Sequence, residues 1–561
     1  MSSAWRFVLA DSLETVLPTV EPRAHADSGG PRGGGSVFLG EPYSVQVAFR
    51  PPPAGRTGSH AVQFTLSGSA APHASIFAVD LVPARMPAFP DHDDNYLVTE
   101  PGLYPDVLRP IPDGRVEPLV GHWRSVWIDV RVDPDAAPAG VEAIDLDLII
   151  TATRASTGEE LYATTVPVTV INQPLPDLDL VNTQWLHADC VLDYYGGTAF
   201  DEGHWAALDQ FIGSAARMGV TGLLTPLWTP PLDTAIGSRR TPVQLIDIAR
   251  DGGDYRFGFD KLGRWLELFR RHGIAYVELS HLFTQWGAKA TPAIDAVVDG
   301  TATQLFGWDV AATDPEYRRF LEALLPQLRS YLAERWDPAK IIFHISDEPH
   351  QDQLDSYQAA RAVVADLLEG CLIVDALSDY AFYTSGVVAN PIVATNHVKP
   401  FLDAGVERLW VYYCVSQNKL VANRFIGMPA ARHRVLGHQL FAADAGGFLH
   451  WGFNFYNAQQ SRYRVDPFTD TTSGGAFPAG DPFIVYPGPD RTVWESTRHR
   501  VAAQAMHDHR AMQLLRDRAG RETVLKIIDP DGALSFSAYP RDPEHFLASR
   551  ERINAAIRAG G

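Results

Sequence analysis

Cysteine is scarce in this chain of 561 residues: only Cys190, Cys371 and Cys414 occur, and their spacing fits no metal-ligand motif. Neither a disulfide framework nor a cysteine zinc site is therefore expected. Long apolar runs are also missing, because no stretch of about 18 apolar residues occurs, and we expect no membrane span. The first residues lack the basic leader of a secretory signal. These absences together predict a cytoplasmic protein.

Positive charge is in short supply as well. The chain holds 47 Lys and Arg against 67 Asp and Glu, a formal net charge of −20, and no basic cluster offsets it. Nucleic acids and polyanionic substrates are therefore disfavoured as partners, since both call for a basic surface. A neutral substrate fits better, and the 11% of aromatic residues suits the apolar faces of sugars. The length predicts two or three domains.

The first third of the chain has the pattern of a β domain. Residues 1–42 look like an irregular lead-in that ends in a Gly/Pro-rich stretch. Apolar residues then alternate with polar ones in the runs 45–49, 126–132, 144–150 and 166–170. This period of two, broken by Pro, Gly and Asp turns, predicts an antiparallel β-sandwich over residues 43–175.

From about residue 180 the pattern changes to strand, polar loop and helix, repeated. The candidate strands are 183–192, 220–228, 274–283, 340–349, 371–379, 391–396, 408–415 and 446–456. Eight strands alternating with helices predict a (β/α)8 TIM-type barrel over residues 176–516. A doubly wound open sheet remains possible, because closure is not visible in a sequence. Residues 517–561 would form a small C-terminal appendage.

Amphipathic helices fill several of the gaps between these strands. Trp205, Leu208, Ile212 and Ala215 share one helical face, as do Leu262, Trp265, Leu266 and Phe269. Asp314 followed by Pro315 is a good N-cap and first residue for a third helix. Pro326 is expected to kink or divide that helix.

Polar and aromatic residues gather at the carboxyl ends of the predicted strands, where the active site of a TIM barrel lies. The opposite strand ends have no comparable collection. We expect substrate contacts from His187, Asp233, His281, Gln285, Trp286, His344, Tyr412, Tyr413, Trp451, Asn454 and Tyr456. Because neighbours on a strand point to opposite faces, at most one of Tyr412 and Tyr413 should face the site.

The adjacent carboxylates Asp347 and Glu348, at the end of the fourth strand, are the best candidates for the chemistry. Both reach one pocket only if the chain bends between them. Pro349 stops strand pairing and is expected to keep Glu348 extended. Adjacent carboxylates lie too close to be an inverting pair with water between them. They suit another division of labour, in which one acid serves the leaving oxygen and one carboxylate holds a substrate group that itself attacks.

Two other classes of function stay open at this point. His187, His281, His344 and His450 lie on four strand ends, as a metal-dependent hydrolase would need, but no H-x-H pair or H-E-x-x-H helix occurs. We therefore expect no metal and no cofactor. A sugar-binding protein without turnover is the second alternative, against which the Asp-Glu pair argues.

Eight stretches of the sequence resemble a known family. They are LWTPPLDT (227–234), ELSHLFTQWGA (278–288), FGWD (306–309), FHISDEP (343–349), VDALSD (374–379), WVYYC (410–414), FLHWGFNFYN (448–457) and FPAGDPFIVYPG (477–488). They look like the domain of unknown function 4091, which belongs with glycoside hydrolase family 123. The resemblance covers roughly residues 175–520.

What the resemblance implies is an exo-acting β-N-acetylgalactosaminidase that removes a terminal β-linked N-acetylgalactosamine with retention. In that family the substrate's acetamido oxygen attacks the anomeric carbon and forms an oxazoline-type intermediate. Asp347 resembles the family's acetamido-orienting aspartate, and Glu348 resembles its general acid/base. From strand position alone, we expect Trp286, Trp451 and Tyr456 to form the sugar platform and Tyr412 or Tyr413 to bond the acetamido oxygen.

Overall fold

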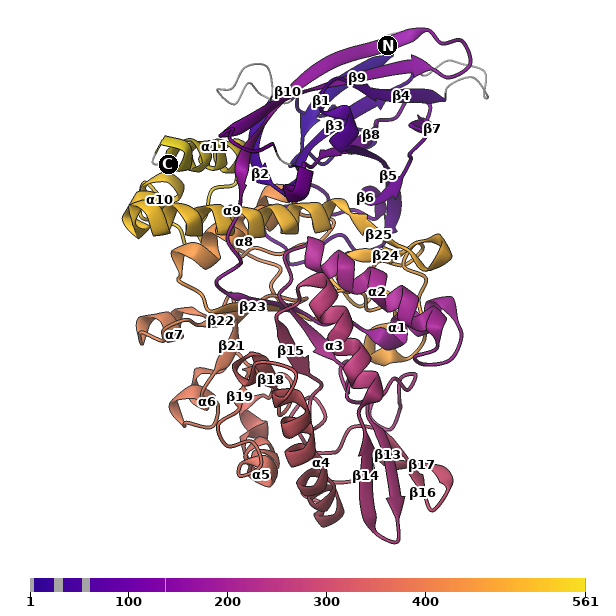
Figure 1. Cartoon of the computed structure of the whole chain (residues 1–561), viewed down its shortest axis with the longest axis vertical. Coiled ribbons are helices and arrows are strands. Elements are labelled where there is room, and N and C mark those ends of the chain that lie inside the picture. Colours follow the sequence, from indigo (N-terminus) through magenta and orange to yellow (C-terminus); the bar gives the residue numbers. More distant parts are fainter. Residues whose placement is uncertain (1–4, 25–33, 53–60, 137, 560–561) are drawn as a thin grey trace. The chain divides into compact units, whose positions relative to one another are not determined.

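The computed structural model describes residues 5–24, 34–52, 61–136 and 138–559, and the chain divides into two compact units (Figure 1). Unit 1 comprises Met1–Asp179, Ala422–Ala443 and Trp494–Gly561. Unit 2 comprises Leu180–Val421 and Asp444–Val493. The domain boundaries at residues 42, 175 and 516 stay predictions.

The described residues of unit 1 form two β-sheets. In the first, the strands that belong to unit 1 have the order β1 (Arg6–Asp11), β3 (Tyr43–Arg50), β8 (Arg124–Val130), β5 (Ala74–Ala84), β6 (Gly102–Pro110) and β25 (Val493–Ser496). The second has the order β2 (Gly35–Leu39), β10 (Glu160–Pro174), β9 (Ala143–Arg154), β4 (Val62–Ser67) and β7 (Arg115–Val116). The alternating apolar side chains of β3, β8, β9 and β10 meet in one hydrophobic cluster, as their period of two predicts.

Two features of unit 1 differ from the sequence expectations. Residues 1–42 are not wholly irregular, because β1 and β2 lie within them. The sheets are also not purely antiparallel, since β2 runs parallel to β10. Neither short strand was visible in the sequence, because its apolar residues are consecutive and do not alternate with polar ones.

The described part of unit 1 has four α-helices: α8 (Ala430–Ala442), α9 (Thr497–Ala519), α10 (Arg521–Ile528) and α11 (Pro543–Ala559). The region 517–561, expected as a small appendage, holds α10 and α11. Both pack on α9 through a cluster that includes Leu515, Ile528 and Ile553. The C-terminal segment is therefore an integral part of the core of unit 1.

Unit 2 is built on a parallel, barrel-like sheet of nine strands. Their order is β19 (Leu372–Ile373), β18 (Ile341–Phe343), β15 (Tyr276–Leu279), β12 (Gly222–Thr225), β11 (Val181–Gln184), β23 (Gly447–His450), β22 (Trp410–Tyr412), β21 (Pro391–Ala394) and β20 (Asp375–Ala376). The two end strands, β19 and β20, are separated in the chain by Val374 alone. The sheet therefore returns nearly to its start. Each observed strand lies within a predicted one except β11, which begins two residues before the predicted strand 183–192.

Seven helices accompany this sheet: α1 (Ala188–Tyr195), α2 (Glu202–Arg217), α3 (Asp260–His272), α4 (Pro315–Ala333), α5 (Leu354–Val364), α6 (Tyr380–Thr384) and α7 (Lys399–Asp403). The predicted apolar faces of α2 and α3 are buried. Asp314 caps α4 by accepting from the N–H groups of Glu316 and Tyr317, as expected. Pro326 does not divide α4, which is held along its length by buried leucines.

A smaller sheet of two hairpins joins the loops after β12 and β15. Its strands have the order β14 (Asp254–Gly258), β13 (Asp247–Asp251), β16 (Ile294–Val298) and β17 (Thr301–Phe306). In Figure 1 the hairpins project from the parallel sheet beside α4. Among the described residues, no helix combines the length and the apolar composition that a bilayer crossing requires.

Candidate active site

A cavity of about 170 Å³ lies in unit 2 where the parallel strands end. This volume is roughly ten times the ~15 Å³ that a single water needs. Its lining residues are Trp185, Leu232, Asp233, Gln285, Trp286, Asp347, Glu348, Ala376, Tyr412, Cys414, Val415, Leu449, Trp451, Gln459 and Phe477. The carboxyl ends of β11, β12, β15, β18, β20, β22 and β23 therefore converge on one space, as the position of the motifs predicted.

Asp347 and Glu348 both line this cavity, because the backbone turns sharply between them. Glu348 has a φ of +42°, in the left-handed region, so Pro349 does not keep it extended. The amide N–H of Glu348 donates to the carbonyl of Ala376 at 3.1 Å, which anchors the turn to β20. The Tyr412 hydroxyl donates to Oε1 of Glu348 at 2.7 Å and fixes the direction of the side chain.

Two further lining residues have the same unusual backbone. Asp233 has a φ of +40° and Trp286 a φ of +57°. A non-glycine residue held in this region costs on the order of 1 to 3 kcal/mol, so the surrounding structure must impose it. Hydrogen bonds do so here: the carbonyl of Asp347 accepts from the N–H of Trp286 at 3.0 Å, and Gln285 accepts from the N–H of Asp233. The strained positions thus belong to one connected wall.

The protonation of the cavity's carboxyl groups is set first by burial and then by their closeness to one another. Burial raises the pKa of Asp347 well above its ordinary value, and the negative charge of Glu348 raises it further. A proton is therefore retained by the pair at pH values where an isolated aspartate is ionised. Burial also raises the pKa of Asp233 to about 6, against a weaker opposing hydrogen bond from the N–H of Gln460 at 3.0 Å.

Trp451 is held as a rigid wall. Its indole Nε1 donates to Asp481 at 3.0 Å, and its carbonyl accepts from Nε2 of His187 at 2.9 Å. The ring meets Phe455 and Phe477 edge to face, with centroids 5.1 and 5.5 Å away. A side chain fixed at both ends loses little entropy when a ligand packs against it.

Of the predicted contact residues, Asp233, Gln285, Trp286, Tyr412 and Trp451 line the cavity. His187, His281, His344, Tyr413, Asn454 and Tyr456 are buried and lie outside its lining. They support the site from behind. Asn454 exchanges two hydrogen bonds with the backbone of His187, and the Tyr456 hydroxyl donates to the carbonyl of Val485 at 2.9 Å. Tyr413 packs on Phe448, so of the two tyrosines only Tyr412 faces the cavity.

Several lining residues were missed by the sequence reasoning. Trp185 lies directly after β11, and Phe477 opens the stretch FPAGDPFIVYPG, so strand position and motif membership were signals for these two. Gln459 had no signal, since it lies in a loop whose path a sequence does not reveal. That loop is tied to the loop after β12, because Ser461 Oγ donates to the carbonyl of Asp233 at 2.7 Å.

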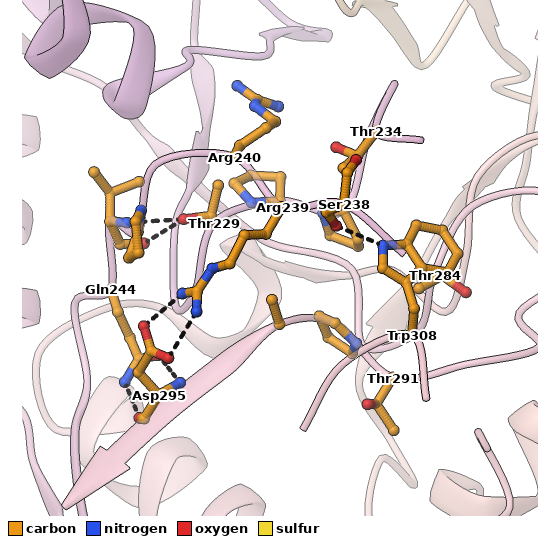
Figure 2. A pocket seen from close by; sticks show the side chains of 16 residues that line it. Thr229, Thr234, Ser238, Arg239, Arg240, Gln244, Thr284, Thr291, Asp295 and Trp308 are labelled. Atoms are coloured by element: carbon orange, nitrogen blue, oxygen red, sulfur yellow. Dashed lines mark hydrogen bonds and ion pairs between the residues drawn. The ribbon is translucent and has the colours of Figure 1, made fainter. Parts of the chain in front are cut away.

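Two other cavities are poorer candidates for the active site. A cavity of about 20 Å³ behind residues 229–244 (Figure 2) has room for about one water. Figure 2 shows Arg239 directed at Asp295 and Arg240 directed the other way. A hollow of about 570 Å³ in unit 1 is larger, but among the described residues that line it Asp113 is the only titratable one.

Two of the strand-end histidines, His187 and His344, are hydrogen-bonded to charged protein groups. Nδ1 of His187 accepts from the buried guanidinium of Arg240 at 3.0 Å, while Nε2 of His344 donates to Glu278 at 2.7 Å. Among the described residues, no group of three or more His, Cys, Asp or Glu side chains is arranged to hold a metal ion. Nothing in this geometry favours the metal-dependent alternative.

Comparison with known proteins agrees with this geometry. The family model "Glycoside hydrolase 123, catalytic domain" matches residues 185–515, more than half of the chain. No curated protein matches. A family 123 glycoside hydrolase from Clostridium perfringens, analysed for glycolipid glycan hydrolysis, is similar over 99% of this chain and 98% of its own, with 14% identity and a TM-score of 0.69.

More distant structures show only weak similarity to this chain. A β-glucuronidase from Bacteroides uniformis aligns over 81% of this chain and 48% of its own, with 10% identity and a TM-score of 0.29. A β-glucuronidase from Ruminococcus gnavus aligns over 83% and 96%, with 8% identity and a TM-score of 0.27. At such TM-scores the likeness does not extend to the whole fold.

Proposed function

The chain belongs to glycoside hydrolase family 123, and on this premise we propose that it is an exo-acting β-N-acetylgalactosaminidase that works by substrate-assisted catalysis with retention. The observation that carries the proposal is the entry of two adjacent carboxyl groups, Asp347 and Glu348, into one cavity. We also interpret the nine-stranded sheet as a (β/α)8 barrel, with β19 and β20 as one interrupted strand, and the two sheets of unit 1 as a sandwich.

The spacing of the pair favours a nucleophile supplied by the substrate. Side chains on neighbouring residues leave no room for the sugar between them, so they cannot serve as a nucleophile and an acid on opposite faces of the ring. An acetamido group at C2 removes this difficulty, because its carbonyl oxygen reaches the anomeric carbon from within the substrate. Asp347 then holds the acetamido N–H and stabilises the positive charge that develops as the oxazoline forms.

Glu348 acts at the other end of the bond being cut. It protonates the departing oxygen and then takes a proton from the water that opens the intermediate. The raised pKa of Asp347 keeps one proton within the pair, and this mechanism requires that proton on Glu348 when the amide approaches Asp347. The Tyr412 hydroxyl, hydrogen-bonded to Glu348 at 2.7 Å, orients the acid within the cavity.

The remaining lining suits a sugar. Trp286, Trp451 and Phe477 supply apolar walls, and Asp233, Gln285 and Gln459 supply polar groups for hydroxyls. The Clostridium perfringens relative was analysed for glycolipid glycan hydrolysis, which supports a glycan with a non-reducing terminal N-acetylgalactosamine as the substrate here. No observation favours a non-catalytic sugar-binding protein, since both carboxyl groups are retained.

The proposal is tested with p-nitrophenyl β-glycosides that differ at C2 and C4. We expect hydrolysis of the N-acetyl-β-galactosaminide, slower hydrolysis of the N-acetyl-β-glucosaminide, and at least 100-fold slower hydrolysis of the β-galactoside, which lacks the acetamido nucleophile. The first sugar released should have the β configuration by proton NMR. Comparable rates on the β-galactoside, or a first product of α configuration, would rule the mechanism out.

A further inference from the structure

A buried chain of charged groups lies directly behind the carboxyl pair. Nε2 of His344 donates to Oε1 of Glu278 at 2.7 Å, and Nδ1 of His344 lies 3.6 Å from Oδ1 of Asp375. All three side chains are at most 1% exposed. They come from three neighbouring positions of the parallel sheet, at β15, just after β18 and at β20.

Both carboxylates of this chain are held in place by further donors. Glu278 accepts from Nε1 of Trp185 at 2.8 Å and from the hydroxyl of Thr183. Asp375 accepts from the N–H of Ile345 at 2.9 Å and from the hydroxyl of Tyr357. Burial raises the pKa of Asp375, while these donors and the charge of His344 oppose that shift. Two carboxyl groups beside one imidazole favour its charged form.

The charge of His344 follows from this clamp. Burial by itself would lower the pKa of the ring, but the two close carboxyl groups of Asp375 and Glu278 outweigh it and raise the pKa to about 10. The ring of His281 stacks on that of His344 with centroids 4.4 Å apart, but its pKa shifts in the opposite direction. Burial and the charge of His344 hold the pKa of His281 well below its ordinary value, so His281 stays neutral.

The sign of its charge distinguishes His344 from the other charged groups that act on Asp347. The charged groups acting on Asp347 most strongly are Glu348, His344, Asp375 and Asp233. His344 is the one cation among them, and three carboxyl groups oppose it. Without that cation the cavity floor would hold only groups that push Asp347 towards its neutral form.

We propose that His344, clamped between Glu278 and Asp375, is a positioning residue whose fixed positive charge keeps Asp347 in the ionised form that holds the substrate's acetamido N–H. The inference rests on the proposed function, and it changes the expected role of His344 from sugar contact to electrostatic support. Asp375 couples the same chain to the backbone, because the N–H groups of Ile345 and Ser346 bind it just before the catalytic pair begins.

The test compares His344→Gln with His281→Gln. Gln at 344 can still donate to Glu278 but carries no charge, so both macroscopic pKa values of the Asp347–Glu348 pair should rise. We expect the acid limb of kcat/KM to move up by about one pH unit and kcat to fall by up to about tenfold at pH 6, with a smaller change in KM. His281→Gln removes a neutral neighbour and should leave the limb where it is.

A second measurement needs no substrate and covers the case in which His344→Gln does not fold. In the wild-type protein labelled with ¹⁵N-histidine, the resonances of His344 should be those of an imidazolium at pH 8. A neutral His344 at pH 8 overturns the inference, and so does an unmoved acid limb in a folded His344→Gln protein. Failure of the wild-type protein to release N-acetylgalactosamine overturns the proposed function instead, and the NMR result then stands independently.

Discussion

The hydroxyl of Tyr412 donates a 2.7 Å hydrogen bond to Oε1 of Glu348, across the cavity from β22 to the loop after β18. Burial, followed by the charge of Glu348, raises the pKa of Tyr412 well above its ordinary value, so the phenol remains a donor throughout the working pH range. The side chain of Glu348, the acid of the proposed mechanism, therefore takes its orientation from the Tyr412 hydroxyl.

Tyr412→Phe should lower kcat by a factor on the order of 10, because a hydrogen bond to a charged group contributes about 1.5 kcal/mol or more. KM for the nitrophenyl substrate should change less. Tyr413→Phe is the matched control, since Tyr413 is buried beside Phe448 and outside the cavity lining. Equal losses in both variants would show that the Tyr412 hydroxyl has no special role.

Glu348→Gln should lower turnover by a factor on the order of 10² or more on the nitrophenyl substrate, since it removes the acid/base. The loss should be larger on a disaccharide, whose leaving alcohol needs the proton more than nitrophenol does. Glu202→Gln is the matched control. It alters the chain's other Asp-Glu dipeptide, which begins α2 and pairs with Arg264 on the surface. Unchanged turnover in Glu348→Gln would remove that residue from the mechanism.

Asp233→Asn should gain stability relative to the wild type as the pH rises from about 4 to 6. The folded pKa of Asp233 is about 6, above the ordinary value of 3.8, so between these values the folded protein holds a proton that the unfolded chain has lost. The wild type therefore loses stability over this range, by roughly 2 to 3 kcal/mol. Urea unfolding of both proteins at pH 4 and pH 7 measures the difference, and parallel curves would contradict it.

Arg240→Met should destabilise unit 2 by about 3 to 5 kcal/mol, because it leaves the carboxylate of Asp189 buried without its partner. Arg240 donates two hydrogen bonds to Asp189, at 2.6 and 2.8 Å, and both side chains are at most 2% exposed. The adjacent Arg239 provides the control, since its pair with Asp295 is more than 30% exposed on both sides. Arg239→Met should cost at most about 1 kcal/mol in thermal or urea unfolding.

The fold of unit 2 was largely predictable because each strand is a short apolar run bounded by polar loops. The prediction for the first strand was wrong at its end. The run 183–192 predicts a single strand, but the chain leaves the sheet at Gln184 and forms α1 from Ala188. Short apolar runs fit a strand or a buried helix equally well, and only tertiary packing decides between them. The prediction of an extended backbone at Glu348 was wrong for a related reason, since the fold overrides the local preference set by Pro349.

The site was predictable to the level of strand ends and no further. The rule that active sites lie at carboxyl ends brought Asp347, Glu348 and Trp451 to the cavity. The same rule did not separate cavity residues from buried ones such as His344, which lies just before the pair but behind the cavity floor. That distinction depends on where the strand stops and the turn begins. A shift of one residue moves a side chain from the cavity to the interior.

The left-handed backbone at Asp233, Trp286 and Glu348 has a consequence for the evolution of the chain. Glycine adopts this conformation without strain, so selection for folding alone would drift towards glycine at all three positions. In the proposed function these three side chains face the sugar, so their strained backbone is a cost in stability that activity requires. Glycine at these positions would relieve the strain but would remove the side chains that the proposed mechanism uses, Glu348 among them.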